Sequence, residues 1–560
     1  MKNITLFLAA VFLAAVILSC ANKSNEQQRE LADFNDSLII NAENIIGLHF
    51  DTAENNQMQR SLKRHLSRYE QMRRHNLDNS VAPSLIFQPL INPDEQTEQE
   101  YANPVPVRDV SLPGSDDEIA FLSVEELSQL IRNGDLSSVE LTRIYLERLK
   151  KYGDSLYCVV TLTENLALEQ AERADREIAE GNYRGPLHGI PYGVKDLLAV
   201  EGYKTTWGAR PYENQVIDRS ATVVKKLEEA GAVLVAKLSM GALAMGDVWF
   251  GGTSRNPWNP EQGSSGSSAG SASATAAGLV AFSLGTETLG SIVSPSTRCG
   301  VTGLRPTFGR VSRAGAMALS WSMDKIGPIC RTADDCALVF DVIRGSDGID
   351  RAVIDRAFNY NFNTDIKDLK IAYLKNEFEG DYESRTNDME VLSVFKKMGV
   401  DLIPIEMEFD NIPLNSLRII LDAEAAAAFD ELTRNGLDSL LTSQADWSWP
   451  NIFRTARFIP AVEYIQANRH RALLMEQMEK IMQDYDVVIS PSFRGDQLLV
   501  TNLTGHPCVV VPDGFNDENS PTSICFIGNL FDEASILLAA SKYQEATDFD
   551  EMHPPLFVTK

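Results

Sequence analysis

Cysteine is scarce in this sequence: only seven occur among 560 residues, and no two form a C-x-x-C pair. This absence excludes zinc ribbons and thioredoxin-type redox chemistry. Apart from Cys20, the cysteines are scattered, mostly inside apolar runs such as "HPCVVVP" and "SICFIG"; they are Cys158, Cys299, Cys330, Cys336, Cys508 and Cys525. We expect buried free thiols at these six positions.

Basic residues are also few compared with acidic ones. The chain has 51 Lys and Arg against 78 Asp and Glu, a formal net charge of −27. A field of that sign repels phosphate backbones, so we expect no nucleic acid partner. Long apolar runs are limited to one, "ITLFLAAVFLAAVILS" at 4–19. Because no second run of spanning length follows, the sequence predicts no transmembrane helix.

The N-terminus has the layout of an export signal. The single apolar run follows "MKN", ends at Cys20 and is short for a membrane span. The stretch "ILSC" at 17–20 resembles the bacterial lipobox, in which the cysteine is lipidated and becomes the first residue. We therefore predict a signal peptide over 1–20 and an exported lipoprotein on the periplasmic or outer-membrane face, which meets the membrane only through a lipid on Cys20. An ordinary signal peptide cut elsewhere is the alternative.

The remaining chain divides into an arm and a body. Residues 21–115 contain a basic, helix-like segment at 55–77 and then a stretch rich in Pro, Asp and Glu, which predicts a helical and extended arm. Residues 116–560 form the predicted catalytic domain. Two capping boxes, "SVEE" from Ser123 and "SSVE" from Ser137, predict the first helices of this domain.

Helices and buried strands alternate through the body. Helices are predicted over 165–180, before Gly181, and over 220–231, which starts with Ser and ends with Gly. Buried strands are predicted at 232–236, 370–374, 486–490, 508–512 and 523–527. This alternation predicts an α/β fold: one large domain with a central mixed β-sheet that helices cover on both faces.

Two clusters of small hydroxyl residues lie close together in the chain: "GSSGSSAGSASATAAG" at 263–278 and "LGTETLGSIVSPSTRCG" at 284–300. Gly and Ser richness is typical of flexible linkers. The first cluster, however, becomes rich in Ala, contains no proline and leads into "LVAFSLG". This pattern favours a loop that enters a tightly packed helix.

Two serine-enzyme motifs match parts of the sequence without their usual surroundings. "GSSAG" at 266–270 fits a nucleophile elbow with Ser268 as nucleophile, but the turn-forming "RNPWNPEQGS" stands where the motif needs a strand. No histidine has a recognisable setting; the downstream candidates are His470, His506 and His553. "SMDK" at 322–325 fits the S-x-x-K of penicillin-binding enzymes, but no S-D-N or K-T-G follows.

A lysine is the third candidate for an activating base. It can accept a proton only when neutral, so it needs apolar surroundings that lower its pKa. Lys195 in "GIPYGVKDLLAV" and Lys237 in "AVLVAKLSM" both meet this condition. Local chemistry alone leaves the two lysines as rivals.

Several ordered blocks together resemble the amidase signature family over roughly 120–550. They are "GIPYGVKD", "GSSAGSASATAAG", "GTETLGSIVSPSTRCGVTGLRPTFGRVSR" and "DKIGPICRTADD". That family includes fatty acid amide hydrolases, peptide amidases and the A subunit of glutamyl-tRNA amidotransferase. The resemblance implies a Ser–cis-Ser–Lys triad of Ser291, Ser267 and Lys195, with no metal and no cofactor. It selects Lys195 over Lys237 and Ser267 over Ser268.

The implied reaction is hydrolysis of a small-molecule amide through an acyl-enzyme. Neutral Lys195 takes a proton from Ser267, Ser267 takes one from Ser291, and Ser291 attacks the amide carbonyl. The backbone N–H groups of the oxyanion hole are those of Thr288, Leu289, Gly290 and Ser291. Two alternatives remain: an amidase of the glutamyl-tRNA amidotransferase A type, and a catalytically inactive binding lipoprotein on the same fold.

Three positions depart from the family's usual D-x-G-G-S and I-R pattern. Glu287 replaces the Asp, Leu289 the first Gly and Val293 the Arg. A positive φ at position 289 would strain Leu289. Arg298, in "STRCG", is expected to supply the missing cation.

Overall fold

The computed structural model of this protein describes residues 35–91, 98–100 and 110–558. The chain separates into two compact units, Met1–Asn76 and Leu77–Lys560. The signal peptide and Cys20 lie outside the described residues, and the predicted boundaries 1–20, 21–115 and 116–560 stay predictions. No helix within the described residues is both long and apolar enough to cross a membrane.

The described part of the first unit is helical. It contains α2 (Asp36–Ile46) and α3 (Thr52–Arg73), and α3 covers most of the basic segment in which a helix is predicted. Asp51 and Glu54 form a capping box at the start of α3, because each side chain accepts a hydrogen bond from the other residue's backbone N–H.

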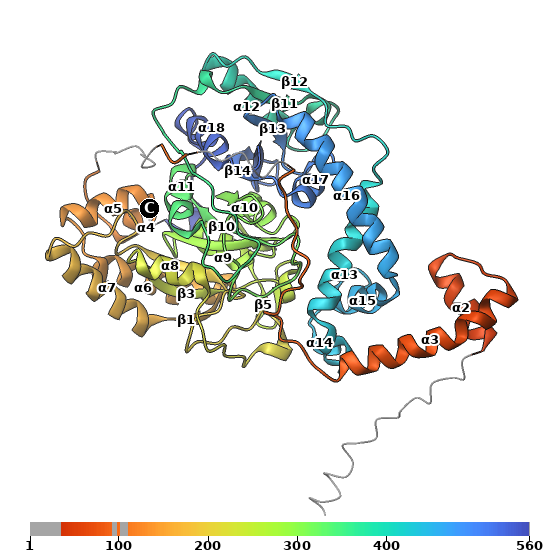
Figure 1. The fold of residues 1–560 in the computed structure, drawn as a ribbon. Coiled ribbons are helices and arrows are strands. Elements are labelled where there is room, and N and C mark those ends of the chain that lie inside the picture. Colours follow the sequence, from red (N-terminus) through yellow and green to blue (C-terminus); the bar gives the residue numbers. More distant parts are fainter. Residues whose placement is uncertain (1–34, 92–97, 101–109, 559–560) are drawn as a thin grey trace, which may run out of the picture. The chain divides into compact units, whose positions relative to one another are not determined.

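An eleven-stranded mixed sheet forms the centre of the second unit (Figure 1). Its strands, in order across the sheet, are β1 (Val159–Leu162), β3 (Val233–Leu238), β2 (Pro191–Lys195), β8 (Phe282–Glu287), β10 (Lys325–Cys330), β9 (Thr302–Arg305), β14 (Cys508–Phe515), β15 (Pro521–Gly528), β13 (Val487–Pro491), β11 (Ile371–Leu374) and β12 (Ile403–Ile405). Strand β2 runs parallel to β3 and β8, and β11 runs parallel to β13 and β12. The pairs from β8 through β13 are antiparallel. The five predicted strands all form in this sheet.

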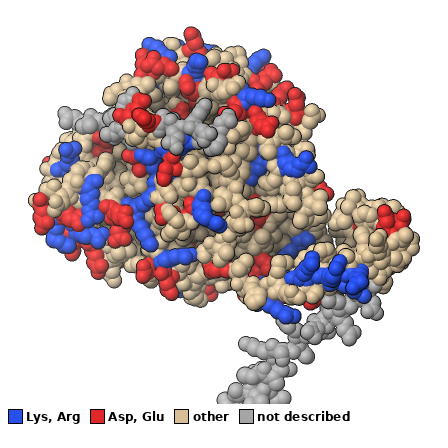
Figure 2. Space-filling model, viewed as in Figure 1, with Lys and Arg blue, Asp and Glu red and all other residues tan. Residues whose placement is uncertain are grey.

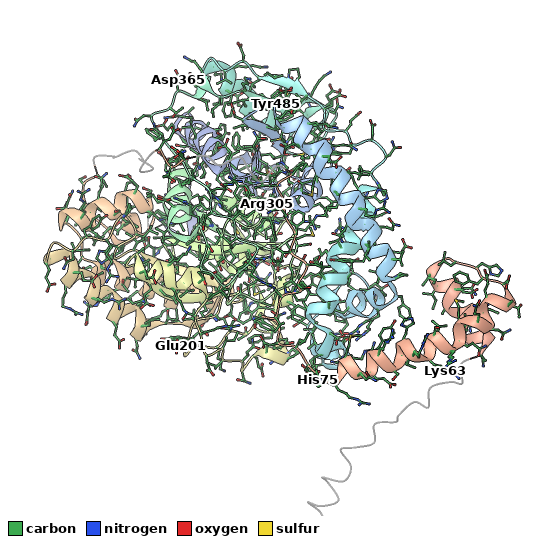
Figure 3. All side chains as sticks on the ribbon, viewed as in Figure 1. Lys63, His75, Glu201, Arg305, Asp365 and Tyr485 are labelled. Atoms are coloured by element: carbon green, nitrogen blue, oxygen red, sulfur yellow. The ribbon has the colours of Figure 1, made fainter. Side chains whose placement is uncertain are left out.

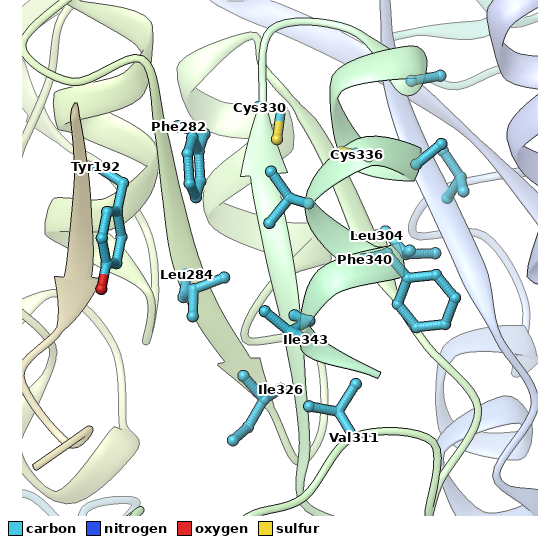
Figure 4. Close-up of a cluster of buried hydrophobic side chains, with 14 of the residues drawn as sticks. Tyr192, Phe282, Leu284, Leu304, Val311, Ile326, Cys330, Cys336, Phe340 and Ile343 are labelled. Carbon is cyan, nitrogen blue, oxygen red and sulfur yellow. The ribbon is translucent and has the colours of Figure 1, made fainter. Parts of the chain in front are cut away.

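Helices cover both faces of the sheet, as predicted. Successive residues of a strand point to opposite faces. Ile329 of β10 packs against Ala272 on one face, while the next residue, Cys330, joins the cluster around Cys336 and Phe340 on the other. Figure 4 shows this second cluster between the strands and α11. The main helices of the body are α5 (Val124–Asn133), α6 (Ser138–Leu156), α7 (Glu164–Ala179), α8 (Thr222–Glu229), α9 (Ala269–Ala276), α10 (Val293–Cys299), α11 (Ala333–Ile343), α12 (Arg385–Lys397), α13 (Ile419–Ala428), α15 (Trp449–Thr455), α16 (Ala461–Met482), α17 (Gln497–Thr504) and α18 (Glu533–Glu545).

Local capping explains where several helices begin. Ser123 and Ser137 form complete capping boxes at the starts of α5 and α6, as predicted. The prediction for α8 is wrong in one detail. Ser220 does not cap this helix, which starts after Ala221 without a side-chain cap; the Ser220 hydroxyl instead accepts a hydrogen bond from the N–H of Glu201. All six cysteines of the body are free and buried, which confirms the expectation of buried thiols.

An extended segment at 77–91, which we call the strap, runs along the body (Figure 1, dark orange). The Asn79 side chain pairs with the backbone of Ala318 by accepting from its N–H at 2.7 Å and donating to its carbonyl at 2.9 Å. Farther along, the Phe87 ring packs edge-on against Phe308 and lies under the guanidinium of Arg471, 3.6 Å from the ring centroid. The strap is thus fixed at both ends.

Candidate active site

Lys195 is the last residue of β2 and is fully buried. Its Nζ donates hydrogen bonds to Ser267 Oγ at 2.8 Å, Thr286 Oγ1 at 2.9 Å and Ser268 Oγ at 3.1 Å. Burial lowers the pKa of Lys195 to about 7, although the charges of Asp324 and Glu287 oppose the shift. A large share of Lys195 is therefore neutral near pH 7 and able to accept a proton.

Ser267 lies in the loop that enters α9. The Gly266–Ser267 peptide bond is cis, as the family resemblance implies. A side chain at position 266 would overlap the carbonyl oxygen of Gly246, so only glycine fits there. Every residue of α9 is buried. This confirms that the first serine cluster is a loop and a packed helix.

Ser291 lies in the loop between β8 and α10. The N–H of Ser268 donates to the carbonyl oxygen of Ser291 at 3.1 Å. The hydroxyls of Ser265 and Ser294 are 2.7 Å apart, which joins the same two loops a second time. The fold therefore brings the two serine clusters and Lys195 together, with a direct side-chain contact between Lys195 and Ser267.

The proposed oxyanion loop adopts its shape through Gly290. This glycine has φ +83°, whereas Leu289 is not in the left-handed region. The condition for strain at Leu289, a positive φ, is therefore not met; its side chain packs against the cluster that contains Met323. Thr288 anchors the start of the loop, because its hydroxyl donates to Asp324 Oδ1 at 2.6 Å.

Glu287 is a buried anchor for the segment that follows Ser291. Its Oε2 accepts from the N–H groups of Ile292 and Val293 at 2.8 and 3.0 Å. Its Oε1 accepts from Arg305 at 2.9 Å and Asn502 at 2.8 Å. Burial alone would raise the pKa of Glu287, but Arg305 and these hydrogen bonds bring it down to about 2. Glu287 therefore stays ionised and holds the start of α10.

Arg298 does not supply the missing cation, so that prediction is wrong. It is exposed, and its guanidinium donates to Gln262 at 3.3 Å. The cation beside Glu287 is Arg305, at the end of β9 and in the interior of the body (Figure 3). Sequence reasoning missed Arg305 because only the pairing of β9 with its neighbours brings it to Glu287. The position of the family's Arg is apolar here: Val293 packs against Cys508, Val510 and Cys525.

The rival candidates have structural partners. Lys237 forms a buried ion pair with Asp196, with Nζ 2.8 Å from Oδ1. Ser268 is bonded to the backbone of Thr286 through both its donor and its acceptor, each at 3.1 Å. A short hairpin, β6 (Arg255–Asn256) with β7 (Asn259–Gly263), forms where turns alone are predicted.

Ser322, the serine of the S-x-x-K match, also has structural partners. The hydroxyl of Ser322 donates to Glu424 at 2.8 Å and accepts from Arg471 at 2.9 Å. Thr286 and Asp324 were missed by sequence analysis, because only the fold places them beside Lys195 and Thr288.

A cavity of about 210 Å³ adjoins this site. Thr286 and Thr288 line it, whereas Lys195, Ser267 and Ser291 do not. The cavity therefore adjoins the site at Thr286, which accepts a hydrogen bond from Lys195, and at Thr288, the start of the oxyanion loop. Strap residues from Asn79 to Ile86 form part of its wall. Over the described ranges, no three His, Cys, Asp or Glu side chains are grouped to hold a metal ion.

Comparisons with known proteins identify the family of this chain. The amidase family model matches residues 140–537. The chain is 33% identical over 480 residues to the A subunit of glutamyl-tRNA(Gln) amidotransferase from Marinomonas sp., a match that covers 78% of this chain and 98% of that protein.

Solved structures give the same result. The peptide amidase of Stenotrophomonas maltophilia is 26% identical with a TM-score of 0.68, over 78% of this chain and 99% of that one. The A subunit of glutamyl-tRNA(Gln) amidotransferase from Thermotoga maritima is 26% identical with a TM-score of 0.66, over 80% and 100%. This chain therefore belongs to the amidase family, whose members hydrolyse the C–N bonds of amides.

Proposed function

We propose that this protein hydrolyses amides through an acyl-enzyme on Ser291, with Ser267 and Lys195 as a proton relay. One observation carries the proposal: the buried Nζ of Lys195 lies 2.8 Å from Ser267 Oγ and forms no ion pair with any residue that the structure describes. A buried ammonium without a counter-ion is costly, which favours the neutral amine that a base requires.

The relay accounts for every proton. Neutral Lys195 takes the proton of Ser267 as Ser267 takes that of Ser291, and Ser291 Oγ bonds to the carbonyl carbon. The developing oxyanion is stabilised by backbone N–H groups of residues 288–291. The C–N bond then breaks, and the proton returns from Lys195 through Ser267 to the leaving nitrogen. Lys195, acting through Ser267, then takes a proton from water as the water attacks the ester. This step releases the carboxylic acid and restores Ser291.

Glu287 is a positioning residue in this reaction. It touches no reacting atom, but it holds the two N–H groups that follow Ser291. Arg305 of β9 and Asn502 of α17 both donate hydrogen bonds to the Glu287 carboxylate and hold it in place. Through Glu287, these two residues therefore orient the loop that carries Ser291.

A second candidate function is favoured by the sequence relatives. The A subunits of glutamyl-tRNA(Gln) amidotransferases match this chain over almost their full length. These relatives support an amidase of that type more strongly than an inactive binding lipoprotein. The net charge of −27 opposes contact with tRNA, and the lipobox-like "ILSC" favours export instead. Figure 2 shows acidic side chains interspersed with basic ones over the visible face.

The experiment is amide turnover by wild type and variants. The panel contains primary carboxamides, glutamine included, and N-acyl amino acids. We expect Ser291→Ala, Ser267→Ala and Lys195→Met to lower kcat/KM on the order of 10³-fold or more. Ser155→Ala is the control, because this exposed hydroxyl donates to the carbonyl of Tyr152 and touches neither serine loop.

The outcomes separate the candidate functions. Glutamine as the sole substrate supports the amidotransferase type. If wild type hydrolyses no amide and takes no serine-directed probe, the inactive binding lipoprotein is the correct alternative.

We propose further that Cys20 carries a lipid and anchors the exported protein. The apolar run and "ILSC" support this location. Fractionation of cells that express wild type or Cys20→Ser tests it. The wild type is expected in the membrane fraction, and Cys20→Ser outside it; equal distribution of the two contradicts the anchor.

A further inference from the structure

The cavity beside the site is rich in cations although the chain is strongly acidic. Its lining includes five basic side chains and two acidic ones: Arg219, Lys225, Arg313, Lys325 and Arg351, against Asp324 and Asp350. The whole chain carries 78 acidic and 51 basic residues. The cavity therefore has the charge balance opposite to that of the protein.

The two acidic groups are already engaged. Asp350 is bound by Arg313 through two hydrogen bonds of 2.8 and 3.1 Å. Asp324 accepts from Thr288 and from the N–H groups of Leu319 and Ser320, at 2.6 to 3.0 Å. Neither carboxylate forms an ion pair with Lys325 within the described part of the chain.

Three cations stand at the exposed side of the cavity. Arg219, Lys225 and Arg351 are all exposed, and none forms an ion pair over residues 35–91, 98–100 and 110–558. Arg219 interacts with the charge of Asp78. An anionic ligand is attracted by such a rim, in a manner that salt weakens.

Lys325 is the buried amine of the cavity. It begins β10, is 2% exposed, and its Nζ donates to the carbonyl of Met323. Once protonated, this amine has three donors, so the bond to Met323 leaves two for a ligand. The charged groups that face Lys325 are Arg305, Arg471, Glu287 and Asp324. Arg305 is held by Glu287, and Arg471 by Ser322 and the carbonyl of Leu503, so these arginines are occupied.

We propose that this cavity binds a carboxylate on the non-reacting end of the substrate, with Lys325 as its buried ligand. The inference rests on the proposed amidase function and names the substrate class: monoamides of dicarboxylic acids. One buried amine matches one negative charge, and Thr288 lines the cavity and begins the oxyanion loop. Thr288 belongs to both the cavity and the oxyanion loop, and in this proposal the acyl chain of the substrate spans from one to the other.

The burial of Lys325 couples carboxylate binding to protonation of its amine. Burial lowers the pKa of free Lys325 well below its usual value, and the nearby charge of Arg305 lowers it further. A bound carboxylate favours the charged amine. Binding at neutral pH is therefore expected to take up a proton.

The first test compares succinamate with 4-methylpentanamide, in which an isopropyl group replaces the carboxylate. We expect wild type to prefer succinamate in kcat/KM, chiefly through KM. Both Lys325→Met and Lys325→Gln are expected to lower that preference at least about tenfold. Arg298→Ala is the matched control, because it removes an exposed arginine that does not line the cavity.

The second test uses calorimetry, which needs no turnover. Succinamate is titrated into Ser291→Ala in two buffers of different ionisation enthalpy, with and without Lys325→Gln. We expect binding with proton uptake, and loss of both when Lys325 is replaced. If wild type hydrolyses 4-methylpentanamide as well as succinamate, and succinamate binding does not depend on Lys325, the inference is wrong while the amidase function stands. If succinamate binds through Lys325 but no amide is hydrolysed, the amidase function fails and the carboxylate site stands.

Discussion

The pH dependence of amide hydrolysis follows directly from Lys195. The base must be neutral, and its pKa is lowered to about 7. The neutral fraction falls about tenfold for each pH unit below that value. We therefore expect kcat/KM to rise with pH, to level off above about pH 8, and to be roughly 100-fold lower at pH 5 than on the plateau.

The assay is kcat/KM for an uncharged amide from pH 5 to 9, so that the substrate does not titrate. Glu287 raises the pKa of Lys195 through its charge and remains ionised throughout this range. Glu287→Gln removes that charge and is expected to move the rising limb to lower pH. Glu390→Gln, at an exposed carboxylate paired with Lys397, is the control and leaves the limb in place. A profile that is flat from pH 6 to 8, or a limb that rises only near pH 10, refutes the neutral-lysine relay.

Three further predictions concern the supports of the site. Arg305→Met leaves Glu287 buried without its cation and is expected to lower the free energy of unfolding by about 3–5 kcal/mol, measured by urea denaturation; an unchanged midpoint contradicts this. Gly290→Ala forces a side chain into φ +83° and is expected to reduce kcat more than Leu289→Gly does, because Leu289 lies outside the left-handed region; the reverse order in steady-state kinetics contradicts the geometry of the loop. Phe87→Ala removes the contacts with Phe308 and Arg471 and is expected to make the strap more sensitive to limited proteolysis within 77–91. Leu85→Ala, at an exposed strap residue, is the control, and equal cleavage of the two variants contradicts the role of Phe87 as an anchor.

Sequence patterns were sufficient for elements whose signals are local. The capping boxes at Ser123 and Ser137 mark the true starts of α5 and α6, because a cap needs only residues three positions apart. The five apolar runs predicted as strands all lie in the sheet. The order of the strands was beyond sequence reasoning, because non-local pairing determines it.

The same limit explains the errors at the site. The roles of Arg305 and Asn502 depend on β9 and α17 approaching Glu287 from 18 and 215 residues away. The neighbouring sequence offers only Arg298 as a cation, and this residue is exposed. The rivalry between Lys195 and Lys237 was likewise undecidable from composition. Both are buried and both donate to a threonine hydroxyl, but Lys195 also contacts two serines, whereas Lys237 forms an ion pair with Asp196.

The most direct test of the central claim is to identify the serine that becomes acylated. Wild type is treated with a fluorophosphonate, digested, and analysed by mass spectrometry of the peptides that contain Ser267, Ser268 and Ser291. The relay predicts one adduct, on Ser291, which disappears in Ser291→Ala and forms far more slowly in Lys195→Met. An adduct on Ser268, or labelling that persists at the same rate without Lys195, contradicts the mechanism.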